Sequence, residues 1–207
     1  MKTLTRSTAA MIAVGLLTLT FAPAPPALAD SSTTEPAAES TAQKAVLVTG
    51  ASTGIGRKIT ELLASKGVFV YAGARKDSDL KELNAIENVR AIRLDVTIQE
   101  EIDAAVATVT KEGRGLYGLV NNAGVAIVAP LIEVDEGDLD FLFDVNVYGP
   151  YRITKAFSPL IIASKGRITT ISSISGILSG TLFGPYSMSK HAIEAYSDSL
   201  AREMERF

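Results

Sequence analysis

The sequence predicts an α/β protein, with a doubly wound and mostly parallel sheet between two layers of helices. Short apolar runs alternate with segments of helical periodicity from Lys44 onward. Such alternation is typical of parallel sheets whose strands are joined by crossover helices. A glycine-rich turn also separates the first expected strand from the first expected helix, at the place where doubly wound folds bind ligands.

Apolar runs predict five strands, over residues 45–48, 68–72, 89–94, 116–120 and 167–171. Helical spacing predicts helices from Ile55 to a stop at Gly67, over 99–110 and over 136–163, and Gly184-Pro185 opens a last helix. Pro150 and Pro159 are expected to kink or interrupt the long helix. The sequence ends at Phe207 inside the last helix, with no further strand after it.

The N-terminal segment has the pattern of an export signal. Lys2 and Arg6 precede an apolar run over 9–22, and small residues follow at 27–29. The sequence therefore predicts a signal peptide over 1–29, a flexible linker over 30–43 and a folded domain over 44–207. The apolar run of about 14 residues is shorter than the roughly 20 that a membrane span needs, so we expect no stable span. We therefore expect the protein to be exported to the periplasm or secreted. The alternatives are that the N-terminal segment stays as an uncleaved anchor, or that it does not function and the protein is cytoplasmic.

Composition excludes several classes of function. Removal of residues 1–29 takes away two cations and no acids, which moves the formal net charge from −3 to −5. An acidic chain lacks the basic surface that nucleic acid requires. The sequence contains no cysteine and only one histidine, His191. Disulfides and thiolate chemistry are excluded, and no metal site is expected.

The glycine-rich turn, Thr49-Gly50-Ala51-Ser52-Thr53-Gly54-Ile55-Gly56, predicts a phosphate site. Gly50 permits a tight turn, Gly54 lets the backbone approach a pyrophosphate, and Gly56 allows close packing of helix on strand. The alternative is a turn without a ligand. The expected cofactor contacts in this segment are Gly50, Ser52, Thr53, Gly54, Ile55 and Gly56.

The end of the second expected strand indicates which dinucleotide is bound. An acid near this point would bind the ribose diol and repel a 2′-phosphate. Here no acid occurs before Asp77, whereas Arg75 and Lys76 could pair with a 2′-phosphate, assisted by Ser52. The alternative is a solvated cationic loop. The pattern favours NADP over NAD.

Tyr186 and Lys190 lie four residues apart in the last expected helix and therefore project from one face. Tyrosine is a poor base at neutral pH unless a nearby cation stabilises the phenolate. Such a pair on its own is common on protein surfaces. The pair indicates a catalytic site only together with the motifs that precede it in the sequence.

Four motifs occur together in one order: the glycine-rich turn, Asn121-Asn122-Ala123-Gly124, Ser173, and Tyr186-x-x-x-Lys190, with Ser173 standing 13 residues before Tyr186. In this order and spacing the sequence resembles the short-chain dehydrogenases/reductases, and the resemblance covers 44–207. It implies that 44–207 are a catalytic, dinucleotide-binding domain with a Rossmann-like, three-layer α/β/α fold, which is expected to lack the C-terminal strands that members of the family have. It implies dimers or tetramers, a nicotinamide cofactor and a catalytic set with distinct roles.

The resemblance implies that Tyr186 donates and accepts the proton and that Lys190 holds the nicotinamide ribose and supports Tyr186. It implies that Ser173 bonds the substrate oxygen, that Asn146 holds a proton-relay water and that Asp95 contacts the adenine amino group. The other implied cofactor contacts are Val96, Asn122, Ala123 and Gly124, besides Tyr186 and Lys190 themselves. Asn122 matches the residue that steadies the central strand.

For several of these residues a purely structural role is the alternative to a functional one. Ser173 lies in a hydroxyl-rich turn, and Asn146 could simply bend its own helix. His191 is expected to be structural. Three apolar residues before Tyr186 could line a substrate pocket or belong to the core: Leu178, Leu182 and Phe183.

The expected function is hydride transfer between NADP and a small alcohol or carbonyl compound, with a hydrophobic substrate as one candidate. The alternative is a non-catalytic nucleotide-binding or interaction module. Helices over 136–163 and 185–207 carry more apolar residues than one sheet face needs, which predicts a homo-oligomer. The apolar residues in question are Phe141, Phe143, Ile161, Ile162, Ile193 and Tyr196.

Overall fold

The computed structural model describes residues 43–207. The expected signal peptide over 1–29 lies outside the described residues, as does the expected linker except for Gln43. Gln43 is attached to the folded unit, because its Nε2 donates to Gly67 O at 2.9 Å and to Asn88 Oδ1 at 3.0 Å.

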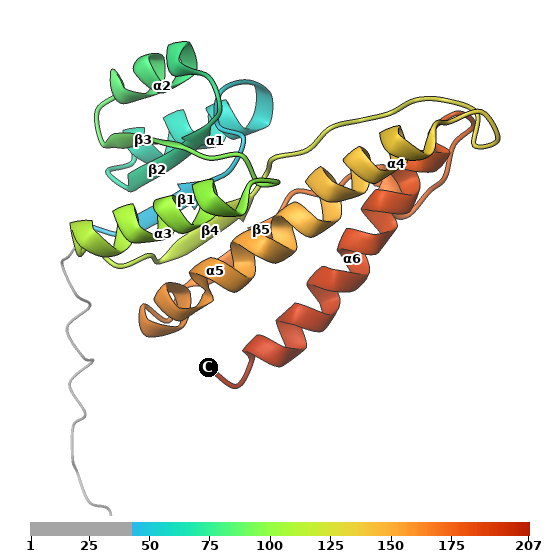
Figure 1. The fold of residues 1–207 in the computed structure, drawn as a ribbon. Coiled ribbons are helices and arrows are strands. Elements are labelled where there is room, and N and C mark those ends of the chain that lie inside the picture. The colour runs from blue at the N-terminus through green and yellow to red at the C-terminus, as the bar shows by residue number, and fades with distance from the viewer. Residues whose placement is uncertain (1–42) are drawn as a thin grey trace, which may run out of the picture. The chain divides into compact units, whose positions relative to one another are not determined.

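The five strands are β1 Ala45–Val48, β2 Phe69–Ala74, β3 Val89–Arg93, β4 Gly118–Asn121 and β5 Arg167–Thr170. They form one parallel sheet in the order β3-β2-β1-β4-β5 (Figure 1). Val48 pairs with Ala72 on one side and with Val120 on the other. The order reverses between β1 and β4, so the segments that follow these two strands meet at the carboxyl edge of the sheet. The expected fold class is confirmed.

The helices are α1 Gly54–Ser65, α2 Asp77–Asn84, α3 Gln99–Glu112, α4 Glu136–Phe143, α5 Gly149–Ala163 and α6 Gly184–Met204. None of them, over residues 43–207, has both the length and the apolar character needed to cross a membrane.

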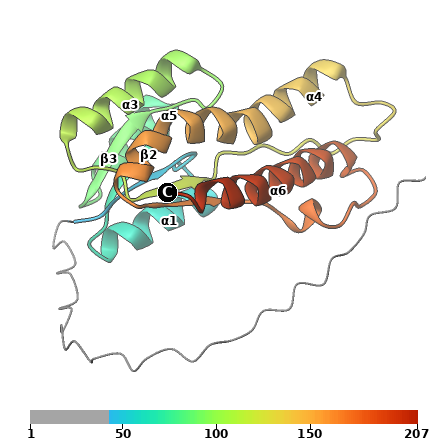
Figure 2. The ribbon, with the colours of Figure 1, turned by 90° about the horizontal axis from the view of Figure 1, so that it is seen from below.

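Alternating side chains of β1 divide the core between the two faces of the sheet. Ala45 and Leu47 pack with buried residues of α3 and α5, whereas Val46 and Val48 pack with those of α1 and α2. Figure 2 shows α3 and α5 together on one side of the sheet and α1 on the other. Successive side chains of a strand point to opposite faces of the sheet, so a strand that is covered on both faces needs apolar residues at every position.

Helix α2 was not expected from the sequence. It has eight residues, and its only apolar side chains are Leu83, which is buried, and Leu80, which is partly buried, so the apolar pattern is too short to indicate a helix. Asp77 and Asp79 lie in its first turn, where negative charge stabilises the exposed amides.

The long helix expected over 136–163 is divided into α4 and α5 by a π-helical turn, Asp144–Tyr148. Pro150 lies in the first turn of α5, where its missing N–H costs nothing. Pro159 lies inside α5, which continues to Ala163, so the interruption expected at this residue is not found. Proline at 159 leaves the carbonyl of Lys155 without its usual donor, and the Ser158 hydroxyl donates to that carbonyl at 3.0 Å.

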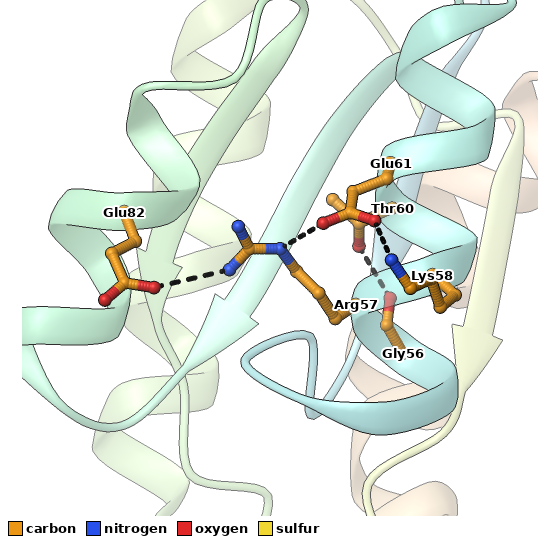
Figure 3. A network of polar contacts seen from close by, with 6 residues as sticks. All are labelled: Gly56, Arg57, Lys58, Thr60, Glu61 and Glu82. Carbon is orange, nitrogen blue, oxygen red and sulfur yellow. Dashed lines mark hydrogen bonds and ion pairs between the residues drawn. The ribbon is translucent and has the colours of Figure 1, made fainter.

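Polar contacts hold the start of α1 against α2 (Figure 3). Arg57 Nε donates to Glu61 Oε1 at 2.8 Å, and its Nη1 lies 3.7 Å from Glu82 Oε2 in α2. The Thr60 hydroxyl donates to Gly56 O at 2.9 Å. These contacts order the helical turn that follows the glycine-rich segment.

Tyr71 of β2 gives the fold a measurable pH dependence. Burial, together with the hydrogen bond from its hydroxyl to Glu112 Oε2 at 3.1 Å, raises the pKa of Tyr71 to about 12. A pKa above the unfolded value of about 10 means that its contribution to stability is complete below pH 10 and is lost as the pH rises toward 12.

We therefore expect Tyr71→Phe to flatten the alkaline loss of stability, since the ring still packs on Phe69, with centroids 5.1 Å apart. Urea unfolding at about pH 8 and about pH 11 measures this. Between about pH 8 and about pH 11, the free energy of unfolding should fall by about 1 kcal/mol more in the wild type than in the variant. An equal loss in both proteins would contradict the assignment.

Candidate active site

The glycine-rich turn lies directly against the segment that follows β4. Gly50 has φ +63°, and a Cβ there would be 2.9 Å from Ala123 Cα. A Cβ on Gly56 would overlap Gly50 O and Asn122 Nδ2. Any side chain at either position would push the turn away from β4, so the approach depends on glycine.

Hydrogen bonds hold this contact together. Asn122 Nδ2 donates to Thr49 O at 2.9 Å and to Gly50 O at 3.1 Å. The Thr49 hydroxyl oxygen accepts from the backbone N–H groups of Asn122 and Ala123, each at 3.0 Å. The side chain of Asn122 therefore supports the turn. Thr49, the first residue of the motif, was not among the expected site residues although it holds the same contact.

A cavity of about 460 Å³ opens beside the turn. It is lined by Gly50, Ser52, Thr53, Gly54, Ile55, Arg75, Asp95, Val96, Asn122, Ala123 and Gly124, all among the expected cofactor contacts, and by Ala74, Leu94, Val125 and Val145, which were not expected. Of the expected cofactor residues, Gly56, Tyr186 and Lys190 are outside this lining.

The cavity has the chemistry that a pyrophosphate needs. Helix α1 begins at Gly54, so the free amides of its first turn open on the cavity. Gly54 has φ +57°, and nothing lies within 4 Å of a Cβ built on it. Backbone amides beside open space form a cradle into which an anionic group fits without displacing protein atoms.

Asp95 is held as an acceptor at the cavity wall. Its Oδ1 accepts from the N–H and the hydroxyl of Thr97, at 3.0 and 2.8 Å, and Arg75 Nη1 lies 3.5 Å from its Oδ2. Burial acts to raise the pKa of Asp95, but the bonds from Thr97 and Arg75 outweigh it and hold the pKa below the usual range. Glu101 Oε2 accepts the Asp95 N–H at 2.6 Å. No motif or spacing in the sequence predicted that Thr97 or Glu101 would support the site.

Arg75 lies at the end of β2 with its side chain 63% exposed. The guanidinium of Arg93, from the end of β3, donates to Arg75 O and to Asp77. Asp77, the first acid after β2, is thus paired with a cation. Arg93 was missed because its proximity depends on the pairing of β2 with β3.

Asn146 lies in the π-helical turn and is 2% exposed. Its Oδ1 accepts from Val125 N at 2.9 Å, and its Nδ2 donates to Val125 O at 2.9 Å and to Ser189 Oγ at 3.0 Å. The side chain of Asn146 thus forms hydrogen bonds with the segment that follows β4 and with α6, rather than with its own helix. Neither Val125 nor Ser189 was expected at the site.

Lys190 joins α6 to the end of β5. Its Nζ donates to Ile171 O at 2.9 Å and lies 5.7 Å from the centroid of the Tyr186 ring. Burial lowers the pKa of Lys190, and the charge of Glu194 opposes part of that change. Ser173 follows Ile171 by two residues and caps a short 3₁₀ turn, its Oγ accepting the Ser175 N–H at 3.1 Å.

Gly124 connects the cavity to these side chains. It lines the cavity, and a Cβ built on it would lie 3.3 Å from Asn146 Oδ1 and 4.0 Å from Lys190 Nζ. Asn146 and Lys190 are therefore brought to the end of the cavity that Gly124 marks.

The remaining candidates are placed differently. Leu178, Leu182 and Phe183 are exposed, by 64%, 47% and 43%, so they do not belong to the core. His191 is exposed, with its Nδ1 at 2.9 Å from Ser187 O in its own helix.

A parallel sheet with a glycine-lined cavity at its reversal point, beside a helix N-terminus, defines the class of dinucleotide-binding α/β proteins. The family model described as short chain dehydrogenase matches residues 44–207. The chain belongs to this family.

Individual relatives agree with this assignment. The chain is 36% identical over 177 residues to the mitochondrial D-beta-hydroxybutyrate dehydrogenase of Mus musculus, covering 81% of this chain and 52% of the relative. It is 38% identical over 167 residues to an NADPH-dependent 3-dehydrocapnine reductase of Ornithobacterium rhinotracheale, and the match covers 76% of this chain and 59% of that relative. A crystal structure of a short-chain dehydrogenase from Streptomyces avermitilis matches with TM-score 0.76 and 39% identity, over 81% of this chain and 63% of that one. The chain thus spans about half to three-fifths of the length of these relatives.

Proposed function

We propose that this chain carries the cofactor-binding and proton-transfer machinery of an NADP-preferring oxidoreductase, which interconverts an alcohol and a carbonyl compound. The observation that supports it most is the position of Gly124, which joins the glycine-lined cavity to Asn146 and Lys190. A nicotinamide dinucleotide in that cavity would supply or accept the hydride.

The side chains of this chain then perform the proton chemistry. Tyr186 would give its hydroxyl proton to the oxygen of a carbonyl substrate, or take the proton from an alcohol. The ammonium of Lys190, 5.7 Å from the ring centroid, favours the phenolate that remains. Because the Ser173 oxygen accepts from Ser175 N, its hydroxyl hydrogen is available to the substrate oxygen.

The preference for NADP rests on charge at the end of β2. Arg75 is exposed at the cavity wall, and the nearby Asp77 is paired with Arg93. An anionic 2′-phosphate would therefore meet the Arg75 cation, while the two nearby acids, Asp77 and Asp95, each lie beside an arginine. The relative from Ornithobacterium rhinotracheale is named as NADPH-dependent, in agreement with this proposal.

We expect Tyr186→Phe to abolish turnover and leave NADPH affinity nearly unchanged, because it removes one hydroxyl and keeps the ring. NADPH oxidation with acetoacetate, cyclohexanone and acetophenone measures turnover, and NADPH fluorescence measures binding. Undiminished turnover in the variant would contradict the role of Tyr186. A wild-type chain that binds NADPH and reduces none of the ketones would favour a non-catalytic nucleotide-binding module.

We expect Arg75→Asp to weaken NADPH binding by about 1–3 kcal/mol, the scale of a lost charge-assisted contact, and NADH binding by less. Titration of both cofactors by fluorescence tests this. Lys81→Asp is a matched control, since it makes the same charge change on an exposed residue of α2 outside the cavity lining. Equal losses for NADPH and NADH would show that Arg75 does not contact the 2′-phosphate.

We also propose that α4, α5 and α6 form the contact between copies of a homo-oligomer. Phe141, Tyr148 and Tyr151 are each about half exposed on α4, the π-helical turn and α5, and Met188 is exposed nearby on α6. Ile161 and Ile193 do not contribute as expected, because both are buried within the fold.

Light scattering on residues 30–207 is expected to give the mass of two or more copies, since these side chains expose an apolar face. Phe141→Glu together with Tyr151→Glu should lower the mass toward one copy by placing charge in the contact. A stable monomer of the unsubstituted chain would refute this proposal.

A further inference from the structure

Ser189 occupies a central place in the hydrogen bonds around Tyr186, although the Tyr186-x-x-x-Lys190 motif leaves its position unspecified. It is completely buried in α6. Its hydroxyl donates to Tyr186 O at 2.7 Å and accepts from Asn146 Nδ2 at 3.0 Å. One side chain thus joins the backbone of Tyr186 to the side chain of Asn146.

The bond to Ser189 completes the set of partners of Asn146. Val125 N and Val125 O bind the two ends of the amide, which sets its orientation. One Nδ2 hydrogen remains, and Ser189 Oγ accepts it. Without that hydroxyl a buried N–H would lose its partner, which is costly enough to move the side chain.

The bond to Tyr186 O fixes the first turn of α6. In the next position, Lys190 Nζ donates to Ile171 O at the end of β5. Two consecutive residues therefore attach the helix in two directions, Ser189 toward the π-helical turn and Lys190 toward the sheet. Tyr186 lies one turn before both, and its carbonyl accepts the bond from Ser189.

We propose that Ser189 is a positioning residue, which holds the Tyr186 turn and the Asn146 amide in one fixed arrangement for proton transfer. This rests on the proposed function, because it assigns Ser189 a role through Tyr186. Ser189 is not among the residues that line the cavity in which the cofactor would be bound. Its removal should therefore lower kcat and leave KM for NADPH almost unchanged, because misplacement of a reacting group affects the chemical step.

The test compares four variants of the full chain in NADPH-dependent reduction of acetoacetate, cyclohexanone and acetophenone. Ser189→Ala should lower kcat about 10- to 100-fold, with KM for NADPH within about threefold. Ser189→Thr and Ser189→Val have the same shape and differ in one hydroxyl, so Thr should exceed Val in kcat by about tenfold at similar Tm. This pair decides the question if Ser189→Ala does not fold.

Ser187→Ala is the matched control. Ser187 is also buried in α6, at 2% exposure, and its Oγ has no hydrogen-bond partner among residues 43–207. This variant should keep kcat within about twofold of wild type, the size of a small local packing change.

The outcomes separate the two proposals. A wild-type chain without activity toward any of the three ketones overturns the proposed function and this inference with it. An active wild type, combined with equal kcat in Ser189→Thr and Ser189→Val, overturns the role of Ser189 alone. An equal loss in Ser187→Ala and Ser189→Ala would show a packing effect and would also overturn it.

Discussion

The close approach of the glycine-rich turn to the end of β4 is the constraint on which the candidate site depends. Gly50 and Gly56 leave no room for a Cβ, and Asn122 binds the backbone of the turn across the gap. Because the turn is held there, α1 starts at the edge of the sheet with its free amides directed at the cavity. A larger residue at either glycine would displace the turn and the helix together.

A second set of contacts positions the side chains that we propose for proton transfer. Lys190 is buried, yet its ammonium has an acceptor in Ile171 O and lies close to the Tyr186 ring. Burial lowers the pKa of Lys190, and a carbonyl partner together with Glu194 offsets part of the cost of keeping it charged. A buried cation beside a tyrosine stabilises a phenolate more than a solvated one would, because water screens it less.

Several elements could be predicted from the sequence because their signals are local. All five strands were located within two residues of their observed bounds. The runs at β1, β2 and β4 are almost wholly apolar, whereas β3 and β5 interleave apolar with polar residues, and both patterns indicate strands. Helix α2 was missed because it contains only two apolar residues, Leu80 and Leu83, which are too few to establish a helical period. The π-helical turn and the uninterrupted passage of α5 through Pro159 were missed as well. Both depend on hydrogen bonds, such as that from Ser158 to Lys155 O, which no spacing of apolar residues reveals.

By itself the sequence determined the fold class and the position of the glycine-rich turn, and it supplied the residues for which we propose the chemistry, because glycine spacing, strand periodicity and motif order are encoded along the chain. The tertiary structure alone decided which side chains support them. Ser189 reaches Asn146, and Arg93 reaches Asp77, only because separate elements pack side by side. The same packing placed Ile161 and Ile193 in the core and left Phe141 exposed. A side chain's partners are set by distances through space, and residues far apart in the chain acquire those distances only when the sheet and its helices assemble.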